Sequence, residues 1–493
     1  MRQAGILLPI SSLPSRYGIG TFSKEAYEFV DFLEKSGQTL WQILPLGPTG
    51  YGDSPYQSFS TFAGNPYYID LEELIEKGWL TRRECNACDF GEDETSVDYE
   101  KIYLSRFKLL RKAFERSKIW EDDDFKWFCG ENAYWLKDYA LYMTVKNIFD
   151  GKSWIEWADD IRLRWPPAME YYYREYEKDI QFYEFLQYMF THQWFSLKAY
   201  ANQKGIKIVG DIPIYVAFDS ADTWADPKLF QLDEEGKPTG VAGCPPDSFS
   251  ATGQLWGNPL YRWDYHRNTG YDWWVRRMAY CFKLYDIVRI DHFRGFDEYY
   301  SIPYGNKTAE NGHWEKGPGL ELFQIIKNRL GEKQVIAEDL GFLTDSVIQL
   351  VRDTGYPGMK ILQFAFDSRE SGDYLPHNYT KNTVLYTGTH DNETTMGWYK
   401  TLKKEDKALA NKYLNIKAGK NVYWDFIRAA LASVSDTVVI PMQDYLGLGS
   451  EARMNIPSTL GCNWKWRLQK EQLTEELAEK IFDMTELYSR FTK

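Results

Sequence analysis

The stretch Tyr285-Asp-Ile-Val-Arg-Ile-Asp-His-Phe-Arg-Gly295 places an acidic residue, Asp291, directly after a short run of apolar and β-branched residues. Two later segments have the same form, and they end in Glu338 and Asp391. Runs of this composition are typical of buried strands, so we expect three strands, each with a carboxylate at its C-terminal end. In a parallel α/β barrel these ends form the active face. Carboxylates gathered there predict chemistry at a glycosidic bond.

Similar apolar runs recur along the chain, and helical stretches separate most of them. This alternation predicts a parallel sheet, and eight units predict a closed (β/α)8 barrel of the TIM type in the α/β class. The expected strands are Gly5–Ile10, Leu40–Leu46, Lys207–Ile212, Ile287–Ile290, Gln334–Ala337, Met359–Phe364, Thr383–Tyr386 and Thr437–Pro441. The expected helices are Ala26–Ser36, Ile180–Lys204, Trp273–Tyr285, Leu322–Leu330, Asp345–Thr354 and Trp424–Val434.

The spacing of the expected strands is uneven, which predicts large insertions in one catalytic unit spanning residues 1–493. After the second strand we expect a mostly helical insertion, 67–179. After the third strand we expect a loop-rich, Gly- and Pro-containing insertion, 215–272, over the substrate cleft. Only about 50 residues follow the eighth strand, and they include an amphipathic helix, Glu471–Phe491. We therefore expect no C-terminal β-sandwich domain.

Charge and composition limit the classes of function that the protein can have. The formal net charge of −13 argues against nucleic acid and anionic membrane surfaces, for which a basic patch is expected. A neutral polymer such as a glucan is compatible with an acidic protein. Aromatic residues make up 17% of the chain; in Gly- and Pro-rich loops their rings suit sugar faces, although they can equally hold such loops down. Pro9 breaks the N-terminal apolar run, and no run of about 18 apolar residues exists. We expect a cytoplasmic protein that does not cross a membrane.

Six cysteines are scattered along the chain, and only Cys85 and Cys88 have a zinc-like spacing. No second pair and no spaced histidine pair accompanies them. We therefore expect free thiols, no metal and no organic cofactor.

The neighbours of the three acids suggest separate roles. Arg289 lies two positions before Asp291, so both side chains face the same side of the strand, and the arginine should keep the carboxylate ionised. Glu338 follows apolar residues, and an acid in such a setting should hold its proton to higher pH. Asp391 with His390 could grip sugar hydroxyls. The alternative for each acid alone is an ordinary helix cap or an arginine partner. His292 is expected to pack rather than react.

These segments resemble the catalytic signatures of the 4-α-glucanotransferases, glycoside hydrolase family 77, which is related to the α-amylases. The resemblance covers nearly the whole chain. The further motifs that carry it are Gly50-Tyr-Gly-Asp-Ser-Pro-Tyr-Gln-Ser-Phe-Ser60, Ala63-Gly-Asn-Pro-Tyr67, Gly210-Asp-Ile-Pro-Ile-Tyr-Val216, Cys244-Pro-Pro-Asp-Ser-Phe-Ser250, Gly253-Gln-Leu-Trp-Gly-Asn-Pro259, Ala452-Arg-Met-Asn-Ile-Pro457 and Asn463-Trp-Lys-Trp-Arg467.

The resemblance implies a role for each matching residue. Asp291 would be the nucleophile, Glu338 the acid/base and Asp391 the stabiliser of the transition state. The implied substrate-binding residues fall into four groups: Asp211, Arg289 and His390 around the sugar at the point of cleavage; Tyr56 stacked beneath it; Gln254 and Trp256 in subsites under a covering loop; and Ser54, Asp367 and Asn463 as further glucan contacts, for which a turn-capping or loop-fixing role is the alternative.

The activity implied by the resemblance is retaining transfer of an α-1,4-glucan segment to the 4-hydroxyl of glucose or another glucan, through a covalent glucosyl-enzyme. Retention predicts carboxyl groups about 5–5.5 Å apart. Two alternatives are an α-amylase-type hydrolase with the same acids and a non-catalytic glucan-binding protein. Cys244, Ser248 and Tyr300 depart from the family pattern and leave the preferred chain length open.

Overall fold

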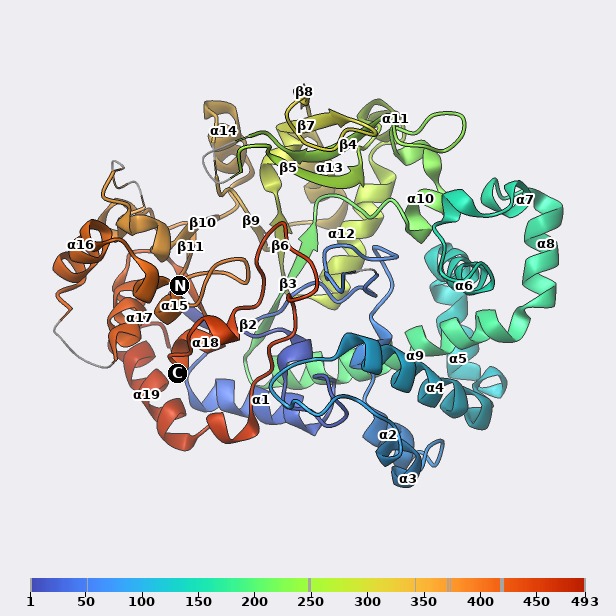
Figure 1. The fold of residues 1–493 in the computed structure, drawn as a ribbon, viewed down its shortest axis with the longest axis horizontal. Helices are drawn as coiled ribbons and strands as arrows, with labels where there is room; N and C mark the ends of the chain where they lie inside the picture. Colours follow the sequence, from blue (N-terminus) through green and yellow to red (C-terminus); the bar gives the residue numbers. More distant parts are fainter. Residues whose placement is uncertain are drawn as a thin grey trace.

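An eight-stranded parallel sheet forms the centre of the protein (Figure 1). The computed structural model describes residues 2–50, 52–246, 250–341, 343–369, 372, 374–416 and 421–491. The strands follow one another in space in the order β1-β2-β3-β6-β9 on one side and β1-β12-β11-β10 on the other. Ala337 N donates to Pro357 O at 3.0 Å, which links β9 to the start of β10 and closes the barrel. The strands are β1 (Gln3–Leu7), β2 (Leu40–Gln42), β3 (Lys207–Pro213), β6 (Ile287–Asp291), β9 (Val335–Ala337), β10 (Gly358–Ile361), β11 (Thr383–Tyr386) and β12 (Thr437–Pro441). The predicted (β/α)8 barrel is confirmed.

Inside the barrel, the side chains are apolar in the lower layer and polar in the layer nearer the C-terminal ends of the strands. Residues two apart on a strand share a face, so each inward apolar residue is followed by another inward residue one step nearer the C-terminal end. Val209 is followed by Asp211, and Ile336 by Glu338. The polar layer thus packs on a layer of buried apolar side chains, here called the plug. This packing holds the polar side chains in fixed positions. The buried residues of the plug are Leu7, Leu40, Val209, Ile287, Ile336, Met359, Ile361, Val384, Tyr386 and Val439.

The helices predicted between the strands surround the sheet. In α1 (Lys24–Lys35), the buried residues Ala26, Phe29, Val30 and Leu33 have the spacing of one helical face. In α14 (Asp345–Thr354), the Thr344 side chain accepts from Val347 N and Gly355 ends the helix with φ 73°. The remaining barrel helices are α12 (Asp272–Leu284), α13 (Leu320–Leu330), α15 (Thr395–Thr401), α16 (Lys404–Leu414) and α17 (Val422–Ala432).

The segment between β2 and β3 is a helical subdomain at the right and lower right of Figure 1. Lys146 from this subdomain forms an ion pair with Asp219 at 2.5 Å, and Asp219 also accepts from Tyr142 Oη at 2.5 Å. These contacts fix the subdomain to the loop after β3. Its helices are α2 (Leu71–Glu76), α3 (Arg82–Asn86), α4 (Tyr99–Ser117), α5 (Asp123–Glu131), α6 (Ala133–Ile148), α7 (Asp159–Arg162), α8 (Pro166–Glu175) and the long α9 (Glu177–Gln203), which leads into β3.

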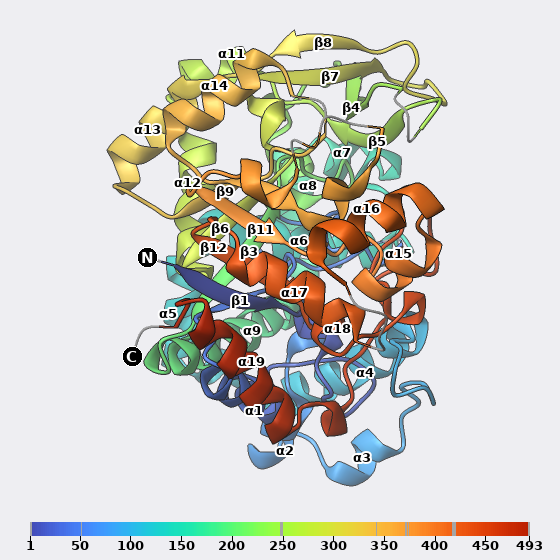
Figure 2. The same cartoon turned by 90° about the vertical axis from the view of Figure 1, so that its left-hand side faces the viewer.

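The second insertion, which was expected to be loop-rich, also contains two strands. It contributes β4 (Gly240–Cys244) and β5 (Gln254–Pro259) to a four-stranded antiparallel sheet, completed by β7 (Glu298–Pro303) and β8 (His313–Lys316) after β6. The glycines that suggested a loop allow this pairing: a Cβ on Gly243 would lie 2.1 Å from Gln254 O. Figure 2 shows this sheet at the top of the molecule, above the barrel. Two short helices complete the insertion, α10 (Ala221–Ala225) and α11 (Trp263–Asn268).

The chain after β12 contains two α-helices and no strand within its described part, 442–491. They are α18 (Met442–Tyr445) and α19 (Glu475–Leu487), and α19 lies beside α1 and α17 (Figure 2). Arg490 then donates to Gln3 O at 3.2 Å and to Asp436 O at 3.3 Å, so the C-terminal segment covers the base of the barrel. Among the described helices, none has the length and apolar character needed to span a membrane.

Candidate active site

Two of the three predicted acids lie side by side at the C-terminal ends of neighbouring strands. Asp291 is the last residue of β6, and Glu338 directly follows β9. The strands pair in parallel with Ile290 opposite Ala337, and Glu338 N donates to Ile290 O at 3.1 Å. Neighbouring strands lie about 4.8 Å apart. This register therefore sets the two carboxylates next to each other.

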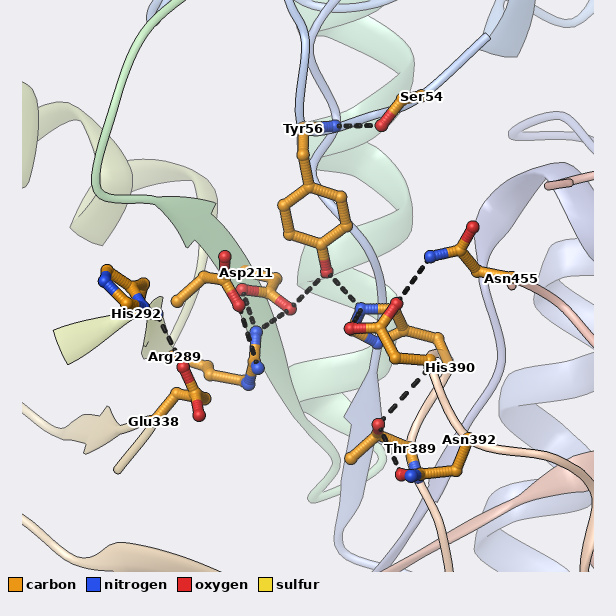
Figure 3. Close-up of polar contacts among 12 residues, drawn as sticks. Ser54, Tyr56, Asp211, Arg289, His292, Glu338, Thr389, His390, Asn392 and Asn455 are labelled. Atoms are coloured by element: carbon orange, nitrogen blue, oxygen red, sulfur yellow. Dashed lines mark hydrogen bonds and ion pairs between the residues drawn. The ribbon is translucent and has the colours of Figure 1, made fainter. Parts of the chain in front are cut away.

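Arg289 connects Asp291 to Asp211, a buried acid on β3. Its Nη2 donates to Asp291 Oδ1 at 3.1 Å, and its Nη1 lies 2.7 and 2.6 Å from the two carboxylate oxygens of Asp211 (Figure 3). Asp211 and Arg289 are direct partners in the sheet register. Both are buried, so each charge depends on the other for stabilisation. The guanidinium is thereby fixed beside Asp291.

Among the described residues, Glu338 accepts two hydrogen bonds from backbone groups and none from a cation. His292 N donates to Oε2 at 2.7 Å and Leu340 N to Oε1 at 2.8 Å. His292 adopts a left-handed conformation with φ 54°, and the turn directs its N–H towards Glu338. Burial and the nearby charge of Asp291 raise the pKa of Glu338 to about 7. This raised pKa agrees with the expectation that Glu338 holds its proton to higher pH.

The pKa of Asp291 differs from what the sequence led us to expect. Burial raises its pKa to about 6, while the Arg289 charge opposes this rise and Asp211 and Asp391 add to it. The sequence indicated the neighbouring arginine but not how deeply the site is buried. Burial raises the pKa of Asp291 more than the ion pair with Arg289 lowers it. The Arg289 guanidinium, which donates to Asp291, favours the ionised form of this carboxyl.

Asp391 and His390 lie in the loop between β11 and α15, where Tyr56 reaches them from the loop after β2. Tyr56 Oη donates to Asp211 Oδ2 at 2.9 Å and lies 2.8 Å from His390 Nε2 (Figure 3). Because the single hydroxyl proton points to Asp211, Nε2–H of His390 is the donor in the second contact. The Tyr56 and His390 rings are stacked with centroids 5.3 Å apart, and His390 Nε2 lies 3.4 Å from Asp391 Oδ2.

Gln254 and Trp256 lie on β5, at the edge of the antiparallel sheet. Trp256 Nε1 donates to Gln254 Oε1 at 3.1 Å. The Trp256 ring meets His292 edge to face, with centroids 4.8 Å apart. Burial lowers the pKa of His292 to about 3, so this ring is neutral and packs, as expected. Trp256 is thus joined to the turn that holds Glu338. Tyr51 and residues 247–249, including Ser248, belong to the quoted motifs but lie outside the described residues.

Three weaker candidates have local partners. Ser54 Oγ accepts from Tyr56 N at 3.3 Å. The Asn463 side chain accepts from Ile456 N at 2.9 Å and donates to Thr459 O at 2.9 Å. Asp367 accepts from the Arg369 guanidinium, which lowers the pKa of this acid. Contacts of this kind favour the turn-capping and loop-fixing alternative.

Asn455 was missed by sequence reasoning. Its Nδ2 donates to Asp391 Oδ1 at 2.6 Å, across 64 positions of sequence. The motif that contains Asn455 was noted, but neither its spacing nor its composition singles out this amide.

The cysteines and possible metal ligands form no further centre. Cys85 and Cys88 are free cysteines. Among the described residues, no group of three or more His, Cys, Asp or Glu is arranged to hold a metal ion.

Comparison with known proteins gives matches over the whole chain. A family model described as 4-alpha-glucanotransferase matches residues 8–474. A 4-alpha-glucanotransferase of Clostridium butyricum is 52% identical over 483 residues, which cover 98% of this chain and 99% of the relative. One of Streptococcus pneumoniae is 50% identical and covers 100% of this chain and 98% of its own. The solved structure of amylomaltase from Streptococcus agalactiae in complex with acarbose has a TM-score of 0.96 and 43% identity, with 100% of both chains covered.

Proposed function

The chain belongs to the 4-alpha-glucanotransferase family, glycoside hydrolase family 77, and we propose that Asp291 and Glu338 carry out its reaction by double displacement. The protein is a 4-α-glucanotransferase that acts on α-glucans. An α-amylase-type hydrolase is not favoured, since the relatives that match over their whole length are glucanotransferases.

In the first step, Asp291 attacks the anomeric carbon while Glu338 gives its proton to the oxygen of the departing glucan. The glycosidic bond breaks and a glucosyl ester forms on Asp291. In the second step, the Glu338 carboxylate takes the proton from the 4-hydroxyl of an acceptor glucose or glucan. The acceptor oxygen bonds to the anomeric carbon, and Asp291 leaves as a carboxylate. Glu338 is protonated again at the end of the cycle.

The single observation that carries this proposal is the pairing of two neighbouring carboxyls with different partners. Arg289 supports a negative charge on Asp291 through its 3.1 Å hydrogen bond, as a nucleophile requires. Within the described part of the chain, the hydrogen-bond donors of Glu338 are the neutral backbone N–H groups of His292 and Leu340, and burial raises its pKa, as a proton donor requires. One residue is therefore suited to attack and the other to transfer a proton.

The surrounding residues supply the remaining roles in this proposal. Asp391 and His390 would hold hydroxyls of the ring at the point of cleavage, next to the Asp211–Arg289 pair, with Tyr56 beneath the sugar. Trp256 and Gln254 would line the acceptor side, because Trp256 packs on the turn that positions Glu338. An acceptor held there is delivered to the glucosyl ester in the correct orientation, which favours transfer over attack by water.

Trapping the glucosyl ester tests the mechanism. The Glu338→Gln variant with α-maltosyl fluoride should accumulate a maltosyl ester, because fluoride leaves without a proton while the acceptor then lacks its base. After an acid quench and proteolysis, mass spectrometry should find the sugar on the peptide that contains Asp291. The wild-type protein, followed by NMR, should give products of retained α-configuration. A sugar on another residue, or a product of β-configuration, would contradict the proposal.

The rate should have a narrow pH optimum. The active form needs Asp291 ionised and Glu338 protonated, so kcat/KM should fall below about pH 6 as Asp291 gains a proton and above about pH 7 as Glu338 loses one. Initial rates of maltotriose disproportionation measure both limbs, with circular dichroism to show that the fold persists. A rate still rising at pH 8 would contradict the protonated state assigned to Glu338.

A further inference from the structure

Asp391 has a hydrogen-bond donor from a distant part of the chain. Asn455 reaches it from the loop after β12, and the 2.6 Å separation between Asn455 Nδ2 and Asp391 Oδ1 is short for an amide donor (Figure 3). The donation goes to a carboxylate, so it is of the stronger, charge-assisted kind.

Arg453 fixes the two backbones that carry this contact. Its Nη2 donates to the main-chain oxygen of Asp391 at 3.0 Å, and its Nε donates to the main-chain oxygen of Asn455 at 2.9 Å. The guanidinium also lies 3.5 Å from Glu393. A single side chain therefore holds the Asp391 loop and the Asn455 loop at a set separation, so that the amide and the carboxylate meet.

We propose that Asn455, held by Arg453, is a positioning residue that sets the orientation and negative charge of Asp391 for the transfer reaction. The inference rests on the proposed role of Asp391 at the sugar ring. With Oδ1 taken by the amide, Oδ2 remains beside His390 for the substrate. Without the amide, the carboxylate could rotate away from the ring.

The charges around Asp391 make such a constraint necessary. His390 Nε2 lies 3.4 Å from Asp391 Oδ2, and the negative charges of Asp291 and Asp391 also interact. Tyr56 also interacts with Asp391 electrostatically. Arg453 contacts the main-chain oxygen of Asp391 and is itself paired with Glu393. A carboxylate repelled by Asp291 would move away from the reacting carbon unless a donor held it in place.

Two substitutions test the role of the amide. Asn455→Ala removes the donor, and kcat should fall about 10- to 100-fold with KM for maltotriose almost unchanged, because misorientation affects the transition state most. Asn455→Asp keeps the shape but puts a like charge beside Asp391, which disfavours its ionised form. The added negative charge also opposes the ionisation of Asp291, which sets the acid limb of the kcat/KM profile, so this limb should move to higher pH. A merely structural role would move neither the limb nor the balance between kcat and KM.

The matched control is Asn382→Ala. The Asn382 amide also donates one hydrogen bond, here to the main-chain oxygen of Gly355 at 3.1 Å, but Asn382 lies just before β11, at the opposite end of the barrel. It should keep wild-type kinetics. Unchanged kcat and pH limb in both Asn455 variants would overturn the inference, as would losses that only follow a lower melting temperature.

Asp391→Asn separates the two possible failures. If it is inactive while the Asn455 variants are unaffected, the positioning role alone is wrong. If it is fully active, the proposed role of Asp391 is wrong as well.

Discussion

Asp291→Asn should lower kcat for maltotriose disproportionation by at least about 10⁴-fold, the loss expected when a covalent nucleophile is removed. An amide has the size of the carboxylate but cannot form the glucosyl ester. Arg289 keeps both contacts to Asp211, so the fold and the affinity for glucan should survive. Glucose release from maltotriose measures the rate, and calorimetric titration with a maltooligosaccharide measures the retained binding.

The same substitution should change Glu338. Because the charge of Asp291 is one cause of the raised pKa of Glu338, removing that charge should lower this pKa, which NMR titration of the glutamate carboxyl can follow. Asp291→Ala is the companion variant, since it cannot revert by deamidation. Turnover near the wild-type rate in both variants would refute the assignment of the nucleophile.

The barrel was predictable because its strands are short, apolar and regularly separated by helices. The residues at which the strands end were not predictable, because the apolar runs continue beyond the last residues that pair with a neighbouring strand. β2 ends at Gln42 although the apolar run continues to Leu46, and Pro45 within that run has no N–H to donate. After β10 ends at Ile361, the buried residues continue into a 3₁₀ turn, Leu362–Phe366. Periodicity alone does not separate a buried turn from a buried strand.

The antiparallel sheet was not predictable from composition. Strand β4 carries Gly243 where its backbone closely approaches Gln254 of β5, and a glycine suggests a loop when no partner strand is known. The partner β7 lies beyond β6, so the pairing depends on contacts distant in sequence. The three acids stand out in the sequence as candidates, because each lies at or shortly after the end of a strand.

What sequence could not supply were the surroundings of those acids. The pKa of Asp291 depends on how deeply the site is buried, and Asp391 accepts a hydrogen bond from Asn455, which comes from another loop. Ser54 and Asn463 have the residue type of sugar ligands, but their hydrogen bonds go to their own loops. Such assignments need the three-dimensional arrangement, because any polar residue near a motif satisfies the pattern.

Glu338→Gln should show an effect that depends on the leaving group. With maltotriose, where the departing sugar oxygen needs a proton, kcat should fall about 10²- to 10⁴-fold. With α-maltosyl fluoride, formation of the ester should remain fast, because fluoride leaves unprotonated and Asp291 with Arg289 is intact. Rapid-quench measurement of fluoride release gives the rate of this first step.

The second step gives an independent test of the same residue. A sugar hydroxyl needs the Glu338 carboxylate as base, whereas azide attacks the glucosyl ester without losing a proton. Azide should therefore restore turnover of α-maltosyl fluoride in Glu338→Gln and produce a maltosyl azide of α-configuration, with little effect on the wild-type protein. Glu338→Ala is the matched variant, because glutamine turns an amide N–H towards one of the two backbone donors, His292 N or Leu340 N, and alanine does not. If both variants lose fluoride release as completely as they lose maltotriose turnover, the defect lies in the geometry of the site, and Glu338 is not the residue that transfers the proton.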